Sequence, residues 1–271
     1  MGFWTLDDIA WDRIDRSKVE PEILAIVKAA SLVEQNGADY ARYLCNVFHD
    51  DPAFRSAAME WGAEEIQHGQ ALGRWAELAD PAFDHAAASA RFSAGFRVNL
   101  RAQDSVRGTR SGELIARCVV ESGTSSYYSA LADATAEPVL KEICRRIAAD
   151  EFRHYRLFYR HLKRYLEHEE LGVWDRLRVA AGRVIETEDD ELAYAFYAAN
   201  ENERPYDREK HSAAYLRRTY GVYRAHHIAH GIGMIFRAVG LNAHGTLQRL
   251  TSRLAWGIMC YRKERMRRIA A

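Results

Sequence analysis

The segments Ala63-Glu64-Glu65-Ile66-Gln67-His68 and Ala149-Asp150-Glu151-Phe152-Arg153-His154 decide how this chain folds. Each contains a Glu-x-x-His pair, and residues three apart lie on one face of an α-helix, so each pair can bind one ion. A further Glu stands about 30 residues before each pair, Glu34 before the first and Glu121 before the second. This order of Glu, Glu-x-x-His, Glu, Glu-x-x-His is the one that a four-helix bundle needs to hold two metal ions in its core.

The spacing of these residues supports a bundle. At 1.5 Å per residue, about 30 residues accommodate two half-helices and a short turn between ligands of an antiparallel pair. The separation of Glu65 from Glu121 is nearly twice as long. The longer gap predicts that the chain crosses the length of the bundle there, with a helix of its own.

The predicted fold class is therefore all-α: a ferritin-like four-helix bundle with a crossover helix and additional C-terminal helices. Residues 1–170 would form the di-iron bundle with its N-terminal segment, and 171–271 would pack on it within one structural domain. Capping residues, prolines and apolar periodicity predict the following helices: 21–48, 52–78, 86–105, 111–134, 138–169, 173–199, 207–239 and 242–268.

Composition limits the classes of partner and compartment. Hydrophobic residues make up 48% of the 271, enough for one large core, and the formal net charge is zero. The net charge therefore gives no general attraction to an acidic partner, and we expect the protein not to bind nucleic acid. We also expect no membrane span, because no apolar run reaches 18 residues. Four dispersed cysteines, without a C-x-x-C pair, predict buried thiols in a reducing cytoplasm: Cys45, Cys118, Cys144 and Cys260.

Six residues are the predicted metal ligands. Glu34, Glu65 and His68 would hold one ion, and the other would be held by Glu121, Glu151 and His154, with one or two of the glutamates bridging the ions. Carboxylate oxygen and imidazole nitrogen suit two iron ions, or a manganese with an iron, and the lack of thiolates argues against structural zinc. A single Glu-x-x-His is more often a solvated helix face. Glu34 and Glu121 each follow an apolar stretch, however, where a carboxylate is costly to bury unless it is paired or binds a metal.

Further residues could assist such a site. Asp150 and Glu64 directly precede ligand glutamates and could orient the imidazoles, although pairing with a nearby cation such as Arg153 would explain them as well. Thr124 follows Glu121 by one helical turn, so its hydroxyl could face the metals and pass protons there. The competing interpretation is a hydroxyl bonded to its own helix backbone.

Several other features favour a structural interpretation. Tyr40 and Tyr127 fit core packing better than a role at the metals, and Cys118 and Cys144 fit buried thiols. The group His226, His227 and His230 could form a third metal site, but lacks a carboxylate at matching spacing. Two basic runs, 160–164 and 261–268, could dock an acidic partner, although such runs are usually solvated helix faces.

The sequence resembles the soluble acyl-carrier-protein desaturases. The stretch from Trp61 to Gly69 is similar to their W-x-A-E-E-x-x-H-G segment, and 147–154 is similar to their A-D-E-x-R-H box. Glu121 followed by Thr124 matches their third-helix Glu and a Thr thought to assist oxygen chemistry. The similarity covers roughly residues 20–168.

This resemblance implies a dimeric di-iron oxidoreductase that activates O₂ with electrons from a ferredoxin-type donor. Its substrate would be a fatty acyl chain, possibly bound to acyl carrier protein, which the enzyme desaturates or hydroxylates. Two alternatives stay open. The first is an oxygenase of a free small molecule, with iron alone or manganese and iron. The second is a non-catalytic ferritin-like protein that binds or detoxifies iron.

Overall fold

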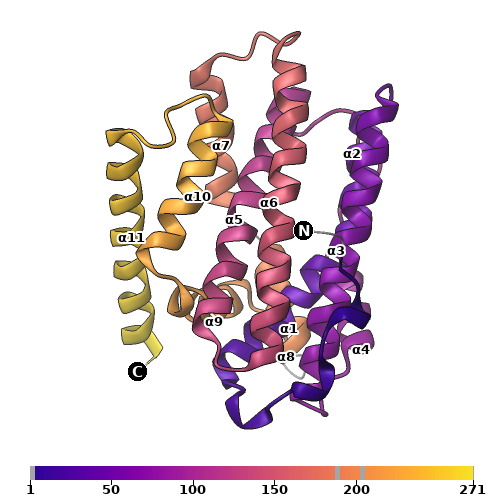
Figure 1. The fold of residues 1–271 in the computed structure, drawn as a ribbon, viewed down its shortest axis with the longest axis vertical. Coiled ribbons are helices and arrows are strands. Elements are labelled where there is room, and N and C mark those ends of the chain that lie inside the picture. Colours follow the sequence, from indigo (N-terminus) through magenta and orange to yellow (C-terminus); the bar gives the residue numbers. More distant parts are fainter. Residues whose placement is uncertain (1–3, 187–189, 202–204, 271) are drawn as a thin grey trace.

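The computed structural model describes residues 4–186, 190–201 and 205–270, and none of these forms a strand (Figure 1). Three single-turn helices over 6–18 lead into the longer ones. The α-helices have these bounds: α1 Pro21–Gln35, α2 Gly37–Val47, α3 Pro52–Ala79, α4 His85–Gly95, α5 Arg110–Ala134, α6 Pro138–Leu166, α7 Val173–Ile185, α8 Asp190–Asn200, α9 Arg208–Val222, α10 Ala225–Ala238 and α11 Thr246–Ala270. The all-α prediction is confirmed.

The helices that carry the Glu-x-x-His pairs begin where local sequence signals predict. Proline occupies the first position of both α3 and α6, where its missing N–H costs nothing. The Asp51 carboxylate accepts the backbone N–H of Phe54 at the start of α3, and Glu137 accepts those of Val139 and Leu140 at the start of α6. These caps satisfy donors that a helix start leaves unpaired.

Five predicted helices differ clearly from the observed ones. The helix expected over 21–48 breaks at Asn36, where the pair Asn36-Gly37 has low helix propensity, and so forms α1 and α2. The crossover helix expected over 86–105 ends at Gly95, after which the backbone of Phe96 is extended. The helix expected over 207–239 is split at Tyr223 and Arg224, both extended, into α9 and α10.

The two remaining differences lie in the C-terminal third. The helix expected over 173–199 is observed as α7 and α8, and 187–189 lie outside the described residues. The last helix begins at Thr246 rather than near Asn242, because the preceding segment turns through Gly240, which has φ of 87°.

Long helices α5 and α6 lie side by side in the middle of the molecule, with α2 and α3 on one side and α10 and α11 on the other (Figure 1). α3 packs against α6 and against both α1 and α2, which places segments from both Glu-x-x-His regions next to each other. α8 packs on α1, and α10 packs on α5. The C-terminal helices thus cover the helices that carry the predicted ligands.

Two hydrophobic cores fill the space between these helices. The first core includes Leu32, Leu72, Tyr128 and Ile147. The second includes Ala41 of α2 together with residues of the three long helices, namely Trp61, Val119 and Tyr155. On each of α3, α5 and α6 the predicted ligands fall in sequence between residues of the first core and residues of the second. The predicted metal site therefore lies between two apolar cores, where water is excluded.

Glycines allow the helices near this site to approach closely. A Cβ added to Gly69, which directly follows His68, would lie 2.7 Å from the backbone nitrogen of Gln35. One added to Gly37 would lie 2.3 Å from Cβ of Glu65. Only glycine fits at such distances, so both contacts between α3 and the α1–α2 segment depend on it.

Two further expectations can be compared with the structure. Cys118 and Cys144 are buried as predicted, but Cys45 is only partly buried and Cys260 is exposed, so the prediction of buried thiols was wrong for these two. Within the described part of the chain, every helix is too short or too polar to cross a bilayer.

Candidate metal centre

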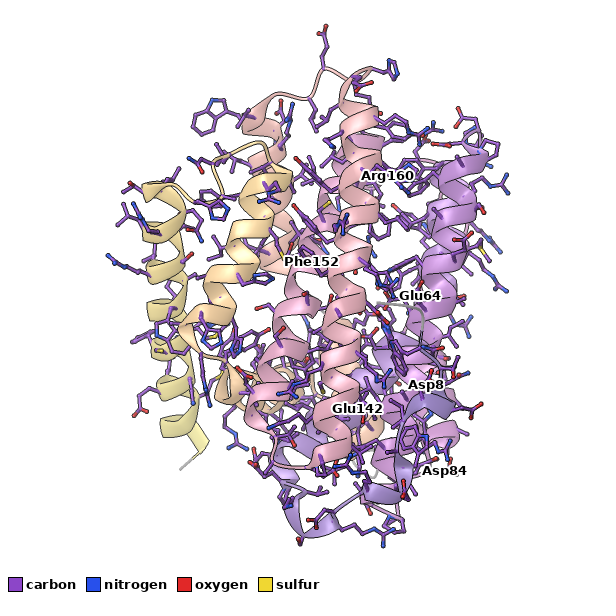
Figure 2. All side chains as sticks on the ribbon, viewed as in Figure 1. Asp8, Glu64, Asp84, Glu142, Phe152 and Arg160 are labelled. Carbon is purple, nitrogen blue, oxygen red and sulfur yellow. The ribbon has the colours of Figure 1, made fainter. Side chains whose placement is uncertain are left out.

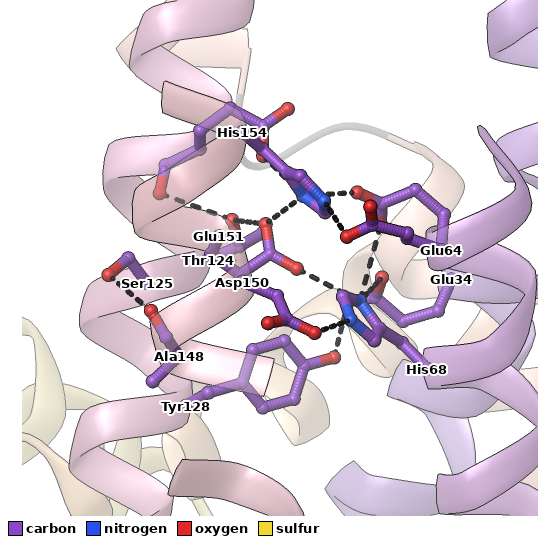
Figure 3. Close-up of polar contacts among 12 residues, drawn as sticks. Glu34, Glu64, His68, Thr124, Ser125, Tyr128, Ala148, Asp150, Glu151 and His154 are labelled. Atoms are coloured by element: carbon purple, nitrogen blue, oxygen red, sulfur yellow. Dashed lines mark hydrogen bonds and ion pairs between the residues drawn. The ribbon is translucent and has the colours of Figure 1, made fainter. Parts of the chain in front are cut away.

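Six side chains from α1, α3, α5 and α6 converge at one place in the core. Figure 3 shows Glu34, His68, Glu151 and His154 of this group. The six are the predicted ligands: Glu34, Glu65, His68, Glu121, Glu151 and His154. None is more than 7% exposed, and His68 is fully buried. Burying four carboxylates together costs several kcal/mol per charge unless cations balance them.

The six residues form two overlapping groups of potential ligand atoms. Glu34, Glu65, His68 and Glu151 make the first group, in which all ligand atoms lie within 4.8 Å of one another. The second group contains Glu65, Glu121, Glu151 and His154, and its ligand atoms also lie within 4.8 Å of one another. Glu65 and Glu151 belong to both groups, as expected of carboxylates that bridge two ions.

Each imidazole places its Nδ1 atom next to the shared carboxylate of the opposite helix. Nδ1 of His68 lies 3.2 Å from Oε1 of Glu151, and Nδ1 of His154 lies 3.0 Å from Oε1 of Glu65. These pairs are close, but no hydrogen bond of acceptable geometry joins them. The atoms face a common point rather than each other.

Buried polar atoms without hydrogen-bond partners gather at this point. Within the described structure they are Oε1 of Glu65, Nδ1 of His68, both Oε atoms of Glu121, Oε1 of Glu151 and Nδ1 of His154. Buried polar groups are normally paired, so six unpaired atoms on five converging side chains indicate a site for cations. Cations with oxygen and nitrogen ligands meet this need.

The outer nitrogens of the two histidines are held by carboxylates. Nε2 of His68 lies 3.1 Å from Oδ2 of Asp150, and Nε2 of His154 lies 3.0 Å from Oε2 of Glu64 (Figure 3). Each carboxylate thus serves the histidine of the opposite Glu-x-x-His helix. A metal-binding histidine normally donates its free N–H in this way, which fixes the ring so that the other nitrogen faces the metal.

Two residues support these carboxylates. Arg153 donates to Oδ1 of Asp150 at 2.5 Å and to Oε2 of Glu64 at 3.0 Å, so it links the two pairs. Trp4 donates its indole N–H to Oδ2 of Asp150 at 2.6 Å, and its ring is stacked on that of His68 at a centroid distance of 6.1 Å. Both proposed roles of Asp150 and Glu64, pairing with an arginine and orienting a histidine, therefore occur together.

The protonation of the cluster follows from burial and from these contacts. Burial and the nearby Glu151 and Glu34 carboxylates raise the pKa of Glu65 well above its usual value. Burial also raises the pKa of Glu121, to about 8. For Glu151, burial alone would raise the pKa, but His154 and His68 hold it well below the usual range. Without cations the cluster therefore retains protons that bound metal would displace.

Thr124 and Tyr128 complete the polar contacts. The hydroxyl of Thr124 is 2.8 Å from Oε2 of Glu151, and it also lies 3.2 Å from its own helix at the Val120 carbonyl. The hydroxyl of Tyr128 donates to Oε1 of Glu34. Neither Tyr128 nor Trp4 was predicted from the sequence to contact the site. Tyr128 follows Glu121 by two helical turns on the same face, which is a signal that could have identified it, whereas nothing local marks Trp4.

The donor set fits two divalent ions of the iron or manganese type. Four carboxylates carry the charge that neutralises two such ions, and the two imidazoles present Nδ1 to them. Oxygen and nitrogen donors of this kind suit iron, manganese and related ions, and neither group contains a cysteine. The structure brings together all six predicted ligands and both predicted helpers, Thr124 and Asp150.

The other candidate residues lie elsewhere. Tyr40 donates to Glu191, a carboxylate of α8, at 2.8 Å, and Tyr127 is buried in the hydrophobic core next to Tyr128. Burial raises the pKa of Cys118 well above its usual value, so this thiol is unreactive at neutral pH. Cys144 is likewise a buried core residue.

The histidines of α10 have a carboxylate neighbour that spacing did not reveal. Nε2 of His227 and of His226 lie 3.1 and 3.5 Å from Oδ2 of Asp133 on α5, whereas His230 is not part of this group. The backbone N–H of Arg224 donates to Nδ1 of His227, so the ring proton is on Nε2 and is donated to Asp133. A hydrogen-bonded histidine explains this contact without a metal.

A basic groove of about 710 Å³ adjoins the site on the outer face of α6. Figure 2 shows Phe152 and Arg160 on this face, with Glu64 nearby between α6 and α3. Five cations line the groove: Arg153, Arg156, Arg160, Lys163 and Arg237. Arg164 of the same basic run instead pairs with Asp51, so only part of the run lines the groove. The second run, 261–268, continues into residues whose side chains are not described.

Among known proteins, no family model matches the chain, and no curated protein does either.

Proposed function

We propose that this protein is an O₂-activating di-iron oxidoreductase built on a ferritin-like four-helix bundle. The observation that carries the proposal is the convergence of four buried carboxylates and two carboxylate-anchored histidines, five of which leave polar atoms unpaired at a common point. Glu34, His68, Glu121 and His154 would each bind one iron, and Glu65 and Glu151 would bind both. A reduced iron pair supplies the electrons that O₂ needs to become an oxidant.

The protein's own residues would control that chemistry. Asp150 and Glu64 hold the imidazole rings so that Nδ1 faces the irons. Thr124 donates a hydrogen bond to Oε2 of Glu151 and can hold a proton at the edge of the site. The two hydrophobic cores on either side keep bulk water away from the oxidant.

For the substrate we propose a fatty acyl chain that is desaturated or hydroxylated, as the resemblance to acyl-carrier-protein desaturases implies. The basic groove supports an acidic carrier or a ferredoxin-type donor as partner, because its lining carries five cations and no carboxylate. Arg153 lies in the groove and contacts both Asp150 and Glu64, so a partner docked there would be close to the irons.

The test is O₂ consumption by the iron-loaded protein with a reductant and an acyl-carrier-protein substrate. We expect substrate-dependent O₂ uptake that continues beyond the amount needed to oxidise the bound iron, with a product two hydrogens lighter or one oxygen heavier by mass spectrometry. Uptake that stops once the bound iron is oxidised, with every acyl substrate, would refute the oxidoreductase and support an iron-binding protein. Turnover of a free lipid with no carrier binding at low salt would refute the carrier.

A further inference from the structure

Helix α11 presents its apolar side chains to solvent. Its outward side chains are each at least half exposed, at 58, 55, 66, 50 and 69% for Leu247, Leu250, Leu254, Ile258 and Tyr261. We call these five residues the α11 stripe. Their spacing of three or four residues puts them on one face of the helix. Isolated exposed leucines are ordinary on a protein surface, but a continuous stripe is not.

The N-terminal half of α11 contacts the protein through two buried polar residues. Gln248 and Ser252 are buried there, and the Gln248 side chain donates to the Ser252 hydroxyl and to the Ala229 carbonyl, both at 3.0 Å. Further along the helix Met266 packs against the first hydrophobic core, and Trp256 and Met259 are half-buried. α11 therefore contacts the protein through polar and apolar side chains and still presents a separate apolar stripe to solvent.

The position of α11 leaves this stripe uncovered. The helix packs on α10 and α9, and it forms one edge of the molecule (Figure 1). On the exposed face, a Cβ added to Gly257 would meet no heavy atom within 4 Å. A glycine at this position allows another helix to come close to the backbone.

The α11 stripe is symmetric about its central residue. Leu250 and Ile258 lie four residues before and after Leu254, and Leu247 and Tyr261 lie seven residues before and after it. An antiparallel copy of the same helix would therefore place Leu254 against Leu254, Leu250 against Ile258, and Leu247 against Tyr261. A two-fold interface requires a surface that is complementary to itself in this way.

We propose that α11 is the interface between two copies of this chain, packed antiparallel across a two-fold axis at Leu254. The stripe presents on the order of 500 Å² of apolar surface, and its flanks bring it towards the ~800 Å² per partner of a stable interface. The rival occupant is an anionic membrane, because Arg249 and Arg253 are exposed beside the stripe. The symmetry of the stripe and the uncovered Gly257 favour a second copy. This interface is independent of the metal chemistry proposed above.

Light scattering after size-exclusion chromatography tests the assembly. We expect wild type to have twice the chain mass of 31.0 kDa, and Leu254→Glu to have the chain mass, because it places two carboxylates on the axis. Met59→Glu, at a 53% exposed apolar residue of α3, is the matched control and should remain a dimer. A monomeric wild type, or a dimer that tolerates Leu254→Glu, would overturn the proposal. So would a monomer that binds anionic phosphatidylglycerol vesicles through the stripe.

Cysteine cross-linking tests the direction of the pair. In a Cys260→Ser background, Leu254→Cys should form a disulfide with its own copy, because only a residue at the axis meets itself. Leu247→Cys alone should not cross-link, whereas Leu247→Cys combined with Tyr261→Cys should. Cross-linking of the single Leu247→Cys variant would indicate a parallel pair and contradict the antiparallel arrangement.

Discussion

Nε2 of His68 lies 3.1 Å from Oδ2 of Asp150, a carboxylate that belongs to the opposite Glu-x-x-His helix. The same exchange occurs in reverse between His154 and Glu64. Each acidic residue therefore precedes a ligand of its own helix but orients the histidine of the other. This exchange joins α3 to α6, so the metal site and the packing of the two helices depend on the same contacts.

Asp150→Asn should weaken metal binding on the His68 side. The variant keeps the shape of the side chain but removes the charge that fixes the imidazole, and loss of such a partner typically lowers affinity 10- to 100-fold. Equilibrium dialysis of the apo protein against increasing ferrous iron or manganese would measure the dissociation constants of variant and wild type. Glu142→Gln is the control, because Glu142 pairs with Arg146 on the same helix and not with a histidine. Equal affinities for Asp150→Asn and wild type would show that the charge of Asp150 does not contribute to metal binding through His68.

Glu64→Gln should produce the corresponding defect on the His154 side. Because each carboxylate serves a different histidine, we expect the two single variants each to retain one tight ion, and the double variant to retain none. Metal stoichiometry at a fixed low free concentration distinguishes these cases. Two tight ions in the double variant would contradict the assigned roles of both carboxylates.

Glu121→Gln should affect the apo and the loaded protein in opposite directions. Glu121 is 1% exposed and neither of its oxygens has a hydrogen-bond partner, so without metal its carboxyl group costs stability. Without metal, the free energy of unfolding of the variant should therefore exceed that of wild type by ~1 kcal/mol or more, which raises its melting temperature by several degrees. With metal the order should reverse, because the variant loses a ligand. A variant that is less stable in both states would indicate a structural role for Glu121.

Thr124→Val should separate metal binding from oxygen chemistry. Valine fills the same space but cannot donate the 2.8 Å hydrogen bond to Glu151. We expect unchanged iron content and O₂-dependent oxidation slowed on the order of 10²-fold if the hydroxyl holds a reacting proton. Thr124→Ser should restore the rate. Equal rates for Thr124→Val and wild type would leave Thr124 with a packing role only.

His161 should make the protein less stable in acid. Burial, together with the nearby Arg164 and Arg160, lowers the pKa of His161 to about 4, and Nδ1 accepts a hydrogen bond from Arg164 at 2.9 Å. Between pH 6.5 and 4 the unfolded chain binds a proton that the folded protein does not, so the free energy of unfolding falls as pH falls through this window.

The acid sensitivity due to His161 should amount to about 2 kcal/mol between pH 7 and 4.5. Because other groups also titrate in this range, the measurement is the difference between wild type and His161→Gln in urea unfolding at each pH. Between pH 7 and 4.5, the free energy of unfolding of wild type should fall by about 2 kcal/mol more than that of His161→Gln. A difference that stays constant with pH would mean that folding does not lower the pKa of His161.

The sequence revealed the site because its signals are local. Positions i and i+3 of a helix share a face, and Pro52 and Pro138 mark helix starts whatever the rest of the chain does. The break at Asn36 was not predicted, because apolar periodicity continues on both sides of it. The contacts of Trp4 with Asp150 and of Asp133 with His227 join residues far apart in the chain, which no periodicity reveals.

The most direct test of the central claim is the iron content of purified protein after anaerobic loading and removal of free metal. We expect close to two irons per chain in wild type, and fewer than two in Glu121→Ala and Glu151→Ala. Wild type should also show an O₂-dependent change in its ultraviolet-visible spectrum after reduction. Wild-type protein that folds but retains no iron, or variants that retain two, would contradict the assignment of this cluster as a di-iron centre.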